Sequence, residues 1–549
     1  MNIEQLTSEH LAVWTEAQVA KAAGGRGRGK KNGDLQAYGI KKLRELILEL
    51  AVRGKLVPQD PADEPAAVLL ERIAAEKARL VKEGKIKRQK KLPEIAEEEK
   101  PFALPEGWEW VSLSQLGDFS GGKTPSKSKS IYWNGDVAWV TPKDMKAKYI
   151  FDTQDHVTSL AVDEGLRLYE NESILFVVRS GILRHTFPVA IAQTPCTVNQ
   201  DLKVLSLYNK ELSSYLYLMM KGFERYILSN LSKKGMTVES IMFREFSCHY
   251  FMLPPLAEQH RIVAKIDELM TLCDRLEQQQ SERAATHQAL VSTLLDALTN
   301  SADHTEFAAT WQRIAENFEI LFTTEQSIDQ LKQTVLQLAV MGKLVPFDGG
   351  ATEFVLKELL EFGPRNGFSP KCVEYKTKFK VLKLGATSYG ALNTDESKFV
   401  GQDIPANSHL LLKEGDILIQ RGNSAKFVGS NVLIRQDYSN YIYPDLMMKI
   451  RVNDKVEPEL LSIILMAPDS REFMWNAMTG TSGSMPKINK KIVEAIPIVI
   501  PRDRKVQRTL VERVDELLTL CDTLKNRLHQ ARSTQVQLAD ALVAQVVEA

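Results

Sequence analysis

The sequence lacks the features that define several broad protein classes. Its 70 Lys and Arg residues balance 70 Asp and Glu residues, so the formal net charge is zero and a uniformly basic nucleic-acid coat protein is excluded. No run of 18 apolar residues is present, so we expect no membrane-spanning helix. The opening MNIEQLTSEHLAVW is polar and mixed in charge, unlike a signal peptide.

Cysteine is also scarce, and its spacing excludes two kinds of stabilising framework. The five cysteines form no CxxC pair, so we expect neither a disulfide framework nor a zinc site, and the chain suits a reducing cytoplasm. A hydrophobic share of 44% and a charged share of 26% exclude a disordered chain. The length of 549 residues allows about three or four domains. The cysteines are Cys196, Cys248, Cys273, Cys372 and Cys521.

Two segments of the sequence occur twice, and their order predicts the architecture. Residues 39–60 (repeat A) and 327–348 (repeat A′) are identical at 12 of 22 positions. Residues 259–276 (repeat B) and 507–524 (repeat B′) are identical at 10 of 18 positions. A variable block lies between A and B and another between A′ and B′. Residues 61–100 have no counterpart in the second half, and their Ala, Glu, Lys and Arg content favours an inserted helix.

Both copies of repeat B begin a segment with the spacing of a coiled-coil helix. Apolar or small residues follow one another at alternating steps of four and three, which is the pattern of a heptad seam. Polar residues interrupt the first copy from Gln280 to His287. Cys273 and Cys521 share one seam position, so we expect structural burial rather than reactive thiols. The predicted seams are Ile262, Ile266, Leu269, Cys273, Leu276, Leu290, Leu294 and Ala297, and Leu510, Val514, Leu517, Cys521, Leu524, Leu528, Ala531, Leu538 and Leu542.

Repeat A′ is also predicted to be helical, from about residue 325 to 341. Its apolar stripe is Ile328, Leu331, Val335 and Leu338. Because successive helices usually fold back on one another, B should pack against A′. The repeat then pairs A with B′. The bundle formed by B and A′ lies between the two blocks in the sequence, so its length is expected to set their separation.

The variable blocks contain short apolar runs bounded by turn residues, which are typical of strands. The predicted fold class is therefore α+β, with two mixed α+β domains separated by two long antiparallel helical (coiled-coil) bundles in a pseudo-two-fold internal repeat. The strand candidates are SILFVV (173–178), VAIA (189–192), DILIQ (416–420) and NVLI (431–434). The predicted segments are an N-terminal helical segment (1–60), a charged insertion (61–100), a first block (101–253), a central helical spacer (254–348), a second block (349–501) and a C-terminal helix (502–549).

GDFSGGKT at 117–124 matches the phosphate-loop pattern GxxxxGK[ST], but its context argues against nucleotide binding. Pro125 follows directly, and the next residues show no helical stripe. The same loop would suit DNA phosphates, since it offers backbone NH groups and lysines, although a plain turn is the alternative. The elements of a methyltransferase or nuclease site are missing, and the histidines lack metal-ligand spacing. We therefore predict no catalytic residue and no metal site in this chain.

Neither block is basic overall, so any DNA-binding face must be local. Residues 101–250 hold 16 basic and 16 acidic residues, and residues 351–500 hold 19 and 17. The GGRGRGKK loop (24–31) and the basic run at 85–91 are further candidates, with a flexible loop and a solvated helix end as the alternatives. Ordinary surface charge is the competing interpretation for every candidate. The candidates in the blocks are Lys123, Lys127, Lys129, Arg179, Arg184, Lys233 and Lys234, and Arg365, Arg421, Lys426, Lys487, Lys490 and Lys491.

The doubled chain resembles the specificity subunit of type I restriction–modification systems. The resemblance is carried by LRELILELAVRGKLVPQDP, LPEGWEWVSLSQLGDFSGGKTP, the GDIL run and LPPLAEQHRIVAKIDELM, and it covers almost the whole chain. The inserted AVLLERIAAEKARLVKEGKIK resembles one subgroup of that family. The second block departs from the pattern, because it opens without an LPEGWxW element and leaves through IPIVIPRDRKVQ.

The resemblance implies a non-catalytic subunit that recognises DNA. Each block would be a target-recognition domain that reads one half of a split, asymmetric site in double-stranded DNA. The helices would set the spacing and dock two modification (methyltransferase) subunits, and restriction subunits would add translocation and cleavage. S-adenosylmethionine, ATP and Mg would be bound by those partners, and no cofactor by this chain. A coiled-coil scaffold without DNA affinity and an enzyme that uses the 117–124 loop are the alternatives.

Overall fold

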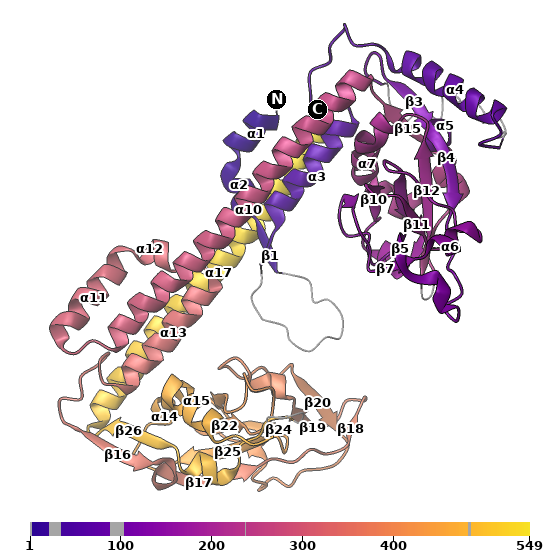
Figure 1. Cartoon of the computed structure of the whole chain (residues 1–549). Helices are drawn as coiled ribbons and strands as arrows, with labels where there is room; N and C mark the ends of the chain where they lie inside the picture. The colour runs from indigo at the N-terminus through magenta and orange to yellow at the C-terminus, as the bar shows by residue number, and fades with distance from the viewer. Residues whose placement is uncertain (1–2, 21–34, 88–103, 236–237, 481–484, 549) are drawn as a thin grey trace. The chain divides into compact units, whose positions relative to one another are not determined.

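A computed structural model describes residues 3–20, 35–87, 104–235, 238–480 and 485–548. The chain divides into two compact units, one formed by residues 1–281 with 532–549 and the other by residues 282–531. Each unit contains one variable block and its neighbouring helices (Figure 1). Two long helices, α10 (Leu256–Thr299) and α17 (Arg504–Glu548), contribute to both units. None of the described helices has both the length and the apolar character that crossing a membrane requires.

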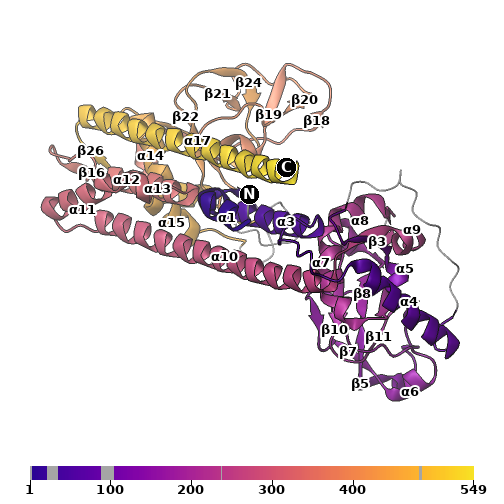
Figure 2. The same cartoon turned by 90° about the horizontal axis from the view of Figure 1, so that it is seen from above.

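In the first unit, α3 (Tyr38–Val52) carries repeat A and packs against both long helices (Figures 1 and 2). The Tyr38 hydroxyl donates to Asp540 Oδ1 on α17 at 2.8 Å. On its other side, Arg44 donates to Asp274 Oδ1 on α10 at 2.6 Å. The predicted pairing of repeat A with the end of the B′ helix is therefore confirmed. The preceding elements are α1 (Ile3–Glu9), α2 (Leu11–Glu16), β1 (Gln18–Ala20) and β2 (Leu35–Ala37).

The second unit repeats this arrangement with α13 (Glu325–Val340), which carries repeat A′. Figure 2 shows α13 between α10 and α17. Gln330 donates to Ser292 Oγ of α10 at 2.9 Å, and Lys525 of α17 donates to Asp329 Oδ1 at 2.7 Å. The predicted stripe of α13 is fully buried, which confirms the predicted packing of B against A′. Two helices, α11 (His304–Glu316) and α12 (Phe318–Leu321), precede it.

The buried seam of each long helix shifts by one residue along its length, so the strict heptad prediction is wrong near the ends. In α10, Leu290 is 49% exposed, whereas Leu298 is fully buried. An undistorted helix returns to the same face after about 36 residues, or ten turns of 3.6, which aligns Leu298 and not Ala297 with Ile262. The buried residues of α10 are Ile262, Ile266, Leu269 and Cys273, then Val291, Leu295 and Leu298, while Leu294 is partly buried and Ala297 is exposed.

The same shift occurs in α17. Leu538 is 46% exposed and Ala539 is buried in its place, although Leu542 is buried as predicted. Ala531 is exposed. The remaining predicted seam residues are buried or partly buried, including Leu510, Val514, Leu517, Cys521, Leu524 and Leu528.

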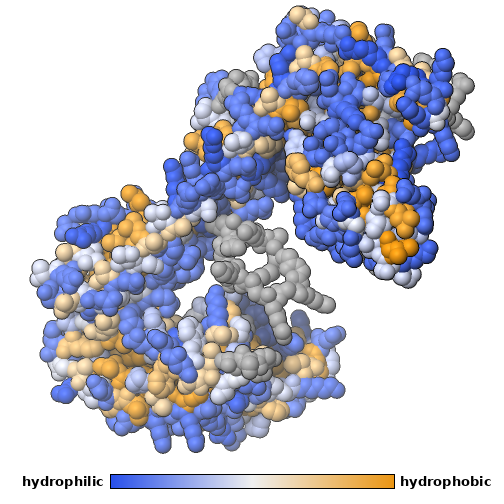
Figure 3. Space-filling model, in the orientation of Figure 1, coloured by the Kyte–Doolittle hydropathy of each residue, from blue (hydrophilic) through white to orange (hydrophobic). Residues whose placement is uncertain are grey.

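Cys273 and Cys521 confirm the expectation of structural thiols. Both side chains are buried, and burial raises the pKa of each thiol to about 11. The helix α10 continues without a break through the polar residues 280–287 that interrupt its apolar seam. Gln280 donates to the Thr15 carbonyl, and the His287 ring lies 3.1 Å from the Ile320 carbonyl. Along the helices, the face seen in Figure 3 is mostly hydrophilic, as expected for helices that bury one apolar seam.

The predicted inserted helix is α4 (Ala66–Lys82). It buries Ala66, Leu69 and Ile73, and Arg261 of α10 pairs with Asp63 just before it. Lys85 and Lys87 of the predicted basic run are exposed beyond its end. The remainder of that run and the 24–31 loop lie outside the described residues.

The two variable blocks share one sheet topology. The first contains a five-stranded sheet with the order β4-β12-β8-β10-β6, and the second a four-stranded sheet with the order β17-β25-β22-β23. The first four strands of each are antiparallel to their neighbours, and their pairings correspond one to one. These strands are β4 (Gly117–Gly121), β6 (Tyr149–Ile150), β8 (Ile174–Val177), β10 (Val189–Ala192) and β12 (Leu202–Leu207), and β17 (Leu360–Asn366), β22 (Asp416–Gln420), β23 (Asn431–Leu433) and β25 (Met447–Val452).

Smaller sheets extend the correspondence. The order β11-β5-β7 in the first block matches β24-β19-β20 in the second, with the first pair parallel and the second antiparallel in each. A two-stranded ribbon closes each block, β3 with β15 and β16 with β26. The fold class and all four predicted strands are confirmed. These strands are β3 (Glu109–Ser112), β5 (Trp133–Val140), β7 (Asp155–Val157), β11 (Cys196–Val198) and β15 (Tyr250–Leu253), and β16 (Ala351–Val355), β18 (Cys372–Val373), β19 (Phe379–Leu382), β20 (Ser397–Val400), β21 (Leu411–Leu412), β24 (Tyr438–Ile442) and β26 (Pro497–Pro501).

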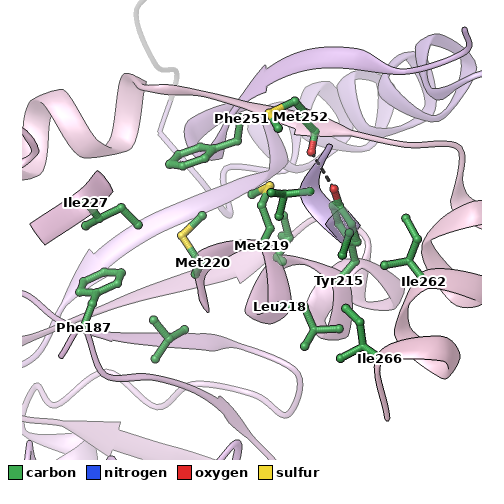
Figure 4. Close-up of a cluster of buried hydrophobic side chains, with 14 of the residues drawn as sticks. Phe187, Tyr215, Leu218, Met219, Met220, Ile227, Phe251, Met252, Ile262 and Ile266 are labelled. Carbon is green, nitrogen blue, oxygen red and sulfur yellow. Dashed lines mark hydrogen bonds between the residues drawn. The ribbon is translucent and has the colours of Figure 1, made fainter. Parts of the chain in front are cut away.

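Each block shares its apolar core with the helices of its own unit. Figure 4 shows Tyr215 and Met219 of the first block beside Ile262 and Ile266 of α10, with the Tyr215 hydroxyl donating to the Met252 carbonyl at 3.1 Å. The block helices are α5 (Leu113–Leu116), α6 (Ser159–Asp163), α7 (Ser213–Gly222), α8 (Glu224–Asn230) and α9 (Phe243–Cys248), and α14 (Pro458–Met466), α15 (Pro468–Asn476) and α16 (Lys490–Glu494).

A buried carboxyl group joins the entry and the exit of the first block. Glu258, in the first turn of α10, is 1% exposed, and its Oε2 accepts from Trp108 Nε1 at 2.9 Å. Burial raises the pKa of Glu258 above its ordinary value of 4.5, against the lowering effects of the Trp108 hydrogen bond and the Arg261 charge. A group whose pKa rises on folding stabilises the fold below its ordinary pKa, and this contribution is lost as pH rises through the folded pKa.

We therefore expect Glu258→Gln to gain stability relative to the wild type as pH rises above the ordinary glutamate pKa of 4.5, because the neutral amide escapes the cost of ionising a buried carboxyl group. Urea unfolding of both proteins across this range measures the difference. Glu106→Gln, at an exposed glutamate of the same entry segment, is the control. A difference that stays constant with pH would contradict the role assigned to Glu258.

Candidate nucleic-acid interface

Three loops meet at one end of the five-stranded sheet in the first block, because β4 and β8 end where the antiparallel β12 begins. Gly122 packs so closely that a Cβ built on it would lie 1.9 Å from the Val198 carbonyl oxygen. The Val178 amide donates to the Asp201 carbonyl at 2.9 Å. We give the name loop cluster 1 to these three loops, residues 121–124, 178–184 and 198–201, together with the adjoining segments 232–235 and 238–241.

A short ribbon brings basic residues of the first block together in loop cluster 1. The ribbon has the order β13-β14-β9, comprising β13 (Ser232–Lys233), β14 (Glu239–Ile241) and β9 (Arg179–Ser180). Arg179 and Lys233 both pair with Ser240 across it. Arg184 lies in the helical turn after β9, with its Nε 3.7 Å from Glu239.

The second block builds the same arrangement, which we name loop cluster 2 (residues 365–368, 421–427, 443–446 and 485–488). A Cβ on Gly367 would lie 2.1 Å from the Tyr443 carbonyl oxygen, as at Gly122. The Arg421 amide donates to the Leu446 carbonyl at 2.8 Å, as Val178 does to Asp201. The Ile488 amide donates to the Arg421 carbonyl at 2.9 Å, as Ile241 does to Val178 at 2.8 Å.

The structure collects some of the predicted basic residues and not others. Loop cluster 1 contains Lys123, Arg179, Arg184, Lys233 and Lys234, and loop cluster 2 contains Arg365, Arg421, Lys426 and Lys487. Lys127 and Lys129 lie further along the loop after β4, where Lys129 Nζ contacts the Tyr132 hydroxyl at 3.1 Å. Lys490 and Lys491 begin α16.

The two clusters differ in how their basic side chains are paired with acids. In loop cluster 1, Arg179 Nε lies 3.9 Å from Asp201, and Arg184 faces Glu239. In loop cluster 2, none of the ion pairs within the described ranges involves Arg421, Lys426 or Lys487. Both clusters therefore carry a local excess of positive charge, although the chain as a whole is neutral.

Several residues that shape loop cluster 2 were missed by the sequence analysis. Arg471 on α15 donates to Ser430 Oγ at 3.1 Å and to the Lys426 carbonyl at 2.8 Å, which fixes the loop after β22 from behind. Burial lowers the pKa of Arg471 to about 10. Gln420, which is fully buried, anchors a second loop. No sequence motif marks these residues, because each acts on a segment more than 30 positions away.

The phosphate-loop alternative for residues 117–124 finds no support in the fold. β4 is an edge strand, and a loop and a 3-10 turn (Ser130–Tyr132) follow it where a phosphate loop would need a helix. The Lys123 amide donates to the Val198 carbonyl at 3.1 Å, so it is not directed at a ligand. Among the residues that the structure describes, no group of three or more His, Cys, Asp or Glu side chains is placed to hold a metal ion.

Comparison with known proteins identifies relatives over the whole chain. A family model for the type I restriction modification DNA specificity domain matches residues 105–285 and 350–531. The specificity subunit of the Escherichia coli type I restriction enzyme EcoEI is 32% identical over 597 aligned residues, covering 99% of both chains. That of EcoAI, also from Escherichia coli, is 33% identical over 605 aligned residues with the same coverage.

Similarity to solved structures is weaker. The HsdS subunit from Thermoanaerobacter tengcongensis aligns with a TM-score of 0.40 at 16% identity, covering 81% of this chain and 98% of that chain. The family model matches each variable block together with the first part of the long helix that follows it, once in each half of the sequence. From these matches and the two full-length relatives, the chain belongs to the family of type I restriction–modification DNA specificity subunits.

Proposed function

We propose that each block of this specificity subunit reads one half of a bipartite, asymmetric site in double-stranded DNA, through its own loop cluster. One observation supports this proposal: the two loop clusters have the same backbone arrangement but carry different exposed side chains. One assembly in each block suggests one half-site for each block, and the different side chains suggest two different sequences. The recognition domains are residues 101–253 and 349–501, next to the helical segments 1–60, 254–348 and 502–549 and the insertion 61–100.

Some basic residues of the two clusters would contact phosphates, and others would contact bases. Lysine ammonium groups suit phosphates, whereas arginine can donate two parallel hydrogen bonds to a guanine edge. Lys123, Lys233, Lys426 and Lys487 are accordingly assigned to phosphates. Arg179 and Arg421 are assigned to base edges, because each follows a central strand, β8 or β22, where the backbone is fixed by neighbouring loops.

The long helices would dock the partners. Leu272 of α10 is 38% exposed and Leu520 of α17 is 47% exposed, and they occupy the same position of repeats B and B′. Matched exposed leucines on two related helices would suit two copies of one modification subunit, with restriction subunits added to that complex. S-adenosylmethionine, ATP and Mg would be bound by those partners in the cytoplasm, and this chain would supply recognition alone.

Exchange of the first block tests independent reading. Replacing residues 101–253 with the corresponding block of a relative should change one half of the site and leave the other half unchanged, because the second unit is untouched. Mapping methylated bases in DNA from cells that carry the exchanged chain and its modification subunit gives the site directly. A change in both halves, or in neither, would show that the blocks do not read DNA independently.

The matched leucines predict separate docking of two modification subunits. Leu272→Asp and Leu520→Asp should each reduce the complex by one modification subunit, since a charge placed in an apolar contact is unpaired, and the double variant should bind neither. Mass measurement of the assembled complex gives the composition. Leu168→Asp, at a leucine of the first block that is 47% exposed, is the matched control. Full complexes in the double variant would exclude this surface.

The boundary between the two units falls within α10 and within α17. The length of these two helices is therefore predicted to set the unread gap between the half-sites. Four residues inserted in both helices, after Ser281 and after Ala531, add about 6 Å. At about 3.4 Å for each base pair, the preferred gap should widen by one or two base pairs. The start of α13 is unsuitable, since buried Ser327 caps that helix with Thr324.

The insertion is assayed by methylation of substrates that differ only in gap length. Insertion in α10 alone is the control and should abolish activity, because it puts one helix out of register with the other. An active double-insertion variant that still prefers the original gap would show that these helices dock partners without measuring distance.

A further inference from the structure

One aromatic side chain at loop cluster 2 stands out by its exposure. Tyr389 is 82% exposed, the highest value among the exposed large hydrophobic side chains of the described residues. It follows the 3-10 turn Leu384–Thr387 and precedes Gly390, whose φ of +80° reverses the chain. An aromatic ring exposed to this extent is available for contact with a binding partner.

The turn that carries Tyr389 is firmly anchored to the central sheet. Gln420 is fully buried at the end of β22, and its Nε2 donates to the Leu384 carbonyl at 2.9 Å. The same amide lies 3.0 Å from both Thr387 Oγ1 and Ser388 Oγ. Its Oε1 accepts from Asn423 Nδ2 at 2.6 Å. One buried amide therefore ties the Tyr389 turn to the residue immediately before Arg421, so Tyr389 is held at loop cluster 2.

The surroundings of Tyr389 combine aromatic and positive groups. Its ring meets the Phe427 ring edge to face, with centroids 5.7 Å apart. Lys426 Nζ lies 5.5 Å from the Phe427 ring centroid. Trp475 Nε1 donates to the Val428 carbonyl at 3.2 Å, which holds this loop together with Arg471. A fixed pair of aromatic rings with one lysine ammonium group beside it suits DNA, which offers negatively charged phosphates and exposed base edges, better than an apolar protein surface.

We propose that Tyr389 is a specificity-determining residue, whose ring contacts a base edge within the half-site read by the second block. This inference rests on the proposed function of that block. Lys426 and Lys487 engage the flanking phosphates and set the depth at which the turn enters the groove. The ring packs against an apolar group of a base, such as the methyl group of thymine, and the hydroxyl group is not required.

The test uses the full chain in complex with its modification subunits. Binding is measured to a set of duplexes in which each base pair of the preferred site is replaced in turn. Tyr389→Ala should lose discrimination at one or two adjacent positions of the second half-site by about five- to hundredfold, the usual effect of one mismatched base pair. Discrimination in the first half-site should be unchanged. Tyr389→Phe should behave as the wild type, because the ring is retained.

Two reference variants separate this role from others. Tyr375→Ala, at a tyrosine of the same block that is 66% exposed, should leave the whole profile unchanged. Lys426→Gln should weaken binding to all duplexes alike, as expected for a phosphate contact. If Tyr389→Ala also weakens all duplexes alike, or changes none, the inference is overturned while the proposed function stands. If the wild type shows no two-part preference, the proposed function itself fails.

Discussion

The burial of one short helix against two long ones is the constraint on which the rest of the structure depends. α3 and α13 each place an apolar face against α10 and α17, and most of the helical stability comes from this packing rather than from intrinsic propensity. The blocks join the same cores, α7 against α3 in the first unit and α14 against α13 in the second. Within the described residues, the core of each recognition domain is therefore continuous with the core of the helices in its own unit.

Because this unit occurs twice in the chain, the features shared by both copies identify the residues that build the scaffold. Gly122 and Gly367 are required by close backbone approach, so a side chain at either position would displace a loop. The sheet interior has diverged even so. Asp416 is fully buried in the second block, where it accepts from Lys449 Nζ at 2.9 Å and from Arg451. The first block has Ser173 at the position of Asp416, so the backbone frame is retained by strand order and close packing rather than by one conserved polar network.

The sequence predicted elements well wherever a local pattern dictated the structure. The strands over 189–192 and 416–420 and the A′ helix match the structure to within one residue, because period and turn residues are local signals. The seam near Leu298 was missed because the small drift of a helix from a heptad accumulates over ten turns. The basic candidates were identified by type, yet their grouping depends on pairings such as Arg179 with Ser240, which no local pattern encodes. Gln420 and Tyr389 were missed for the same reason.

The neutral charge of the chain is consistent with recognition that depends on bases more than on phosphates. Affinity from phosphate contacts alone is independent of sequence and falls steeply with salt, so a strongly basic subunit would be held at random sites throughout a genome. Each loop cluster holds only a few basic side chains, offset in part by Asp201 and Glu239 in loop cluster 1 and by Asp445 in loop cluster 2, and this would limit that non-specific binding. Discrimination then depends on the ratio of specific to non-specific affinity, which base-edge contacts raise and phosphate contacts do not. The base contact proposed for the anchored Tyr389 turn would raise that ratio, because it would add contact with the bases without adding charge.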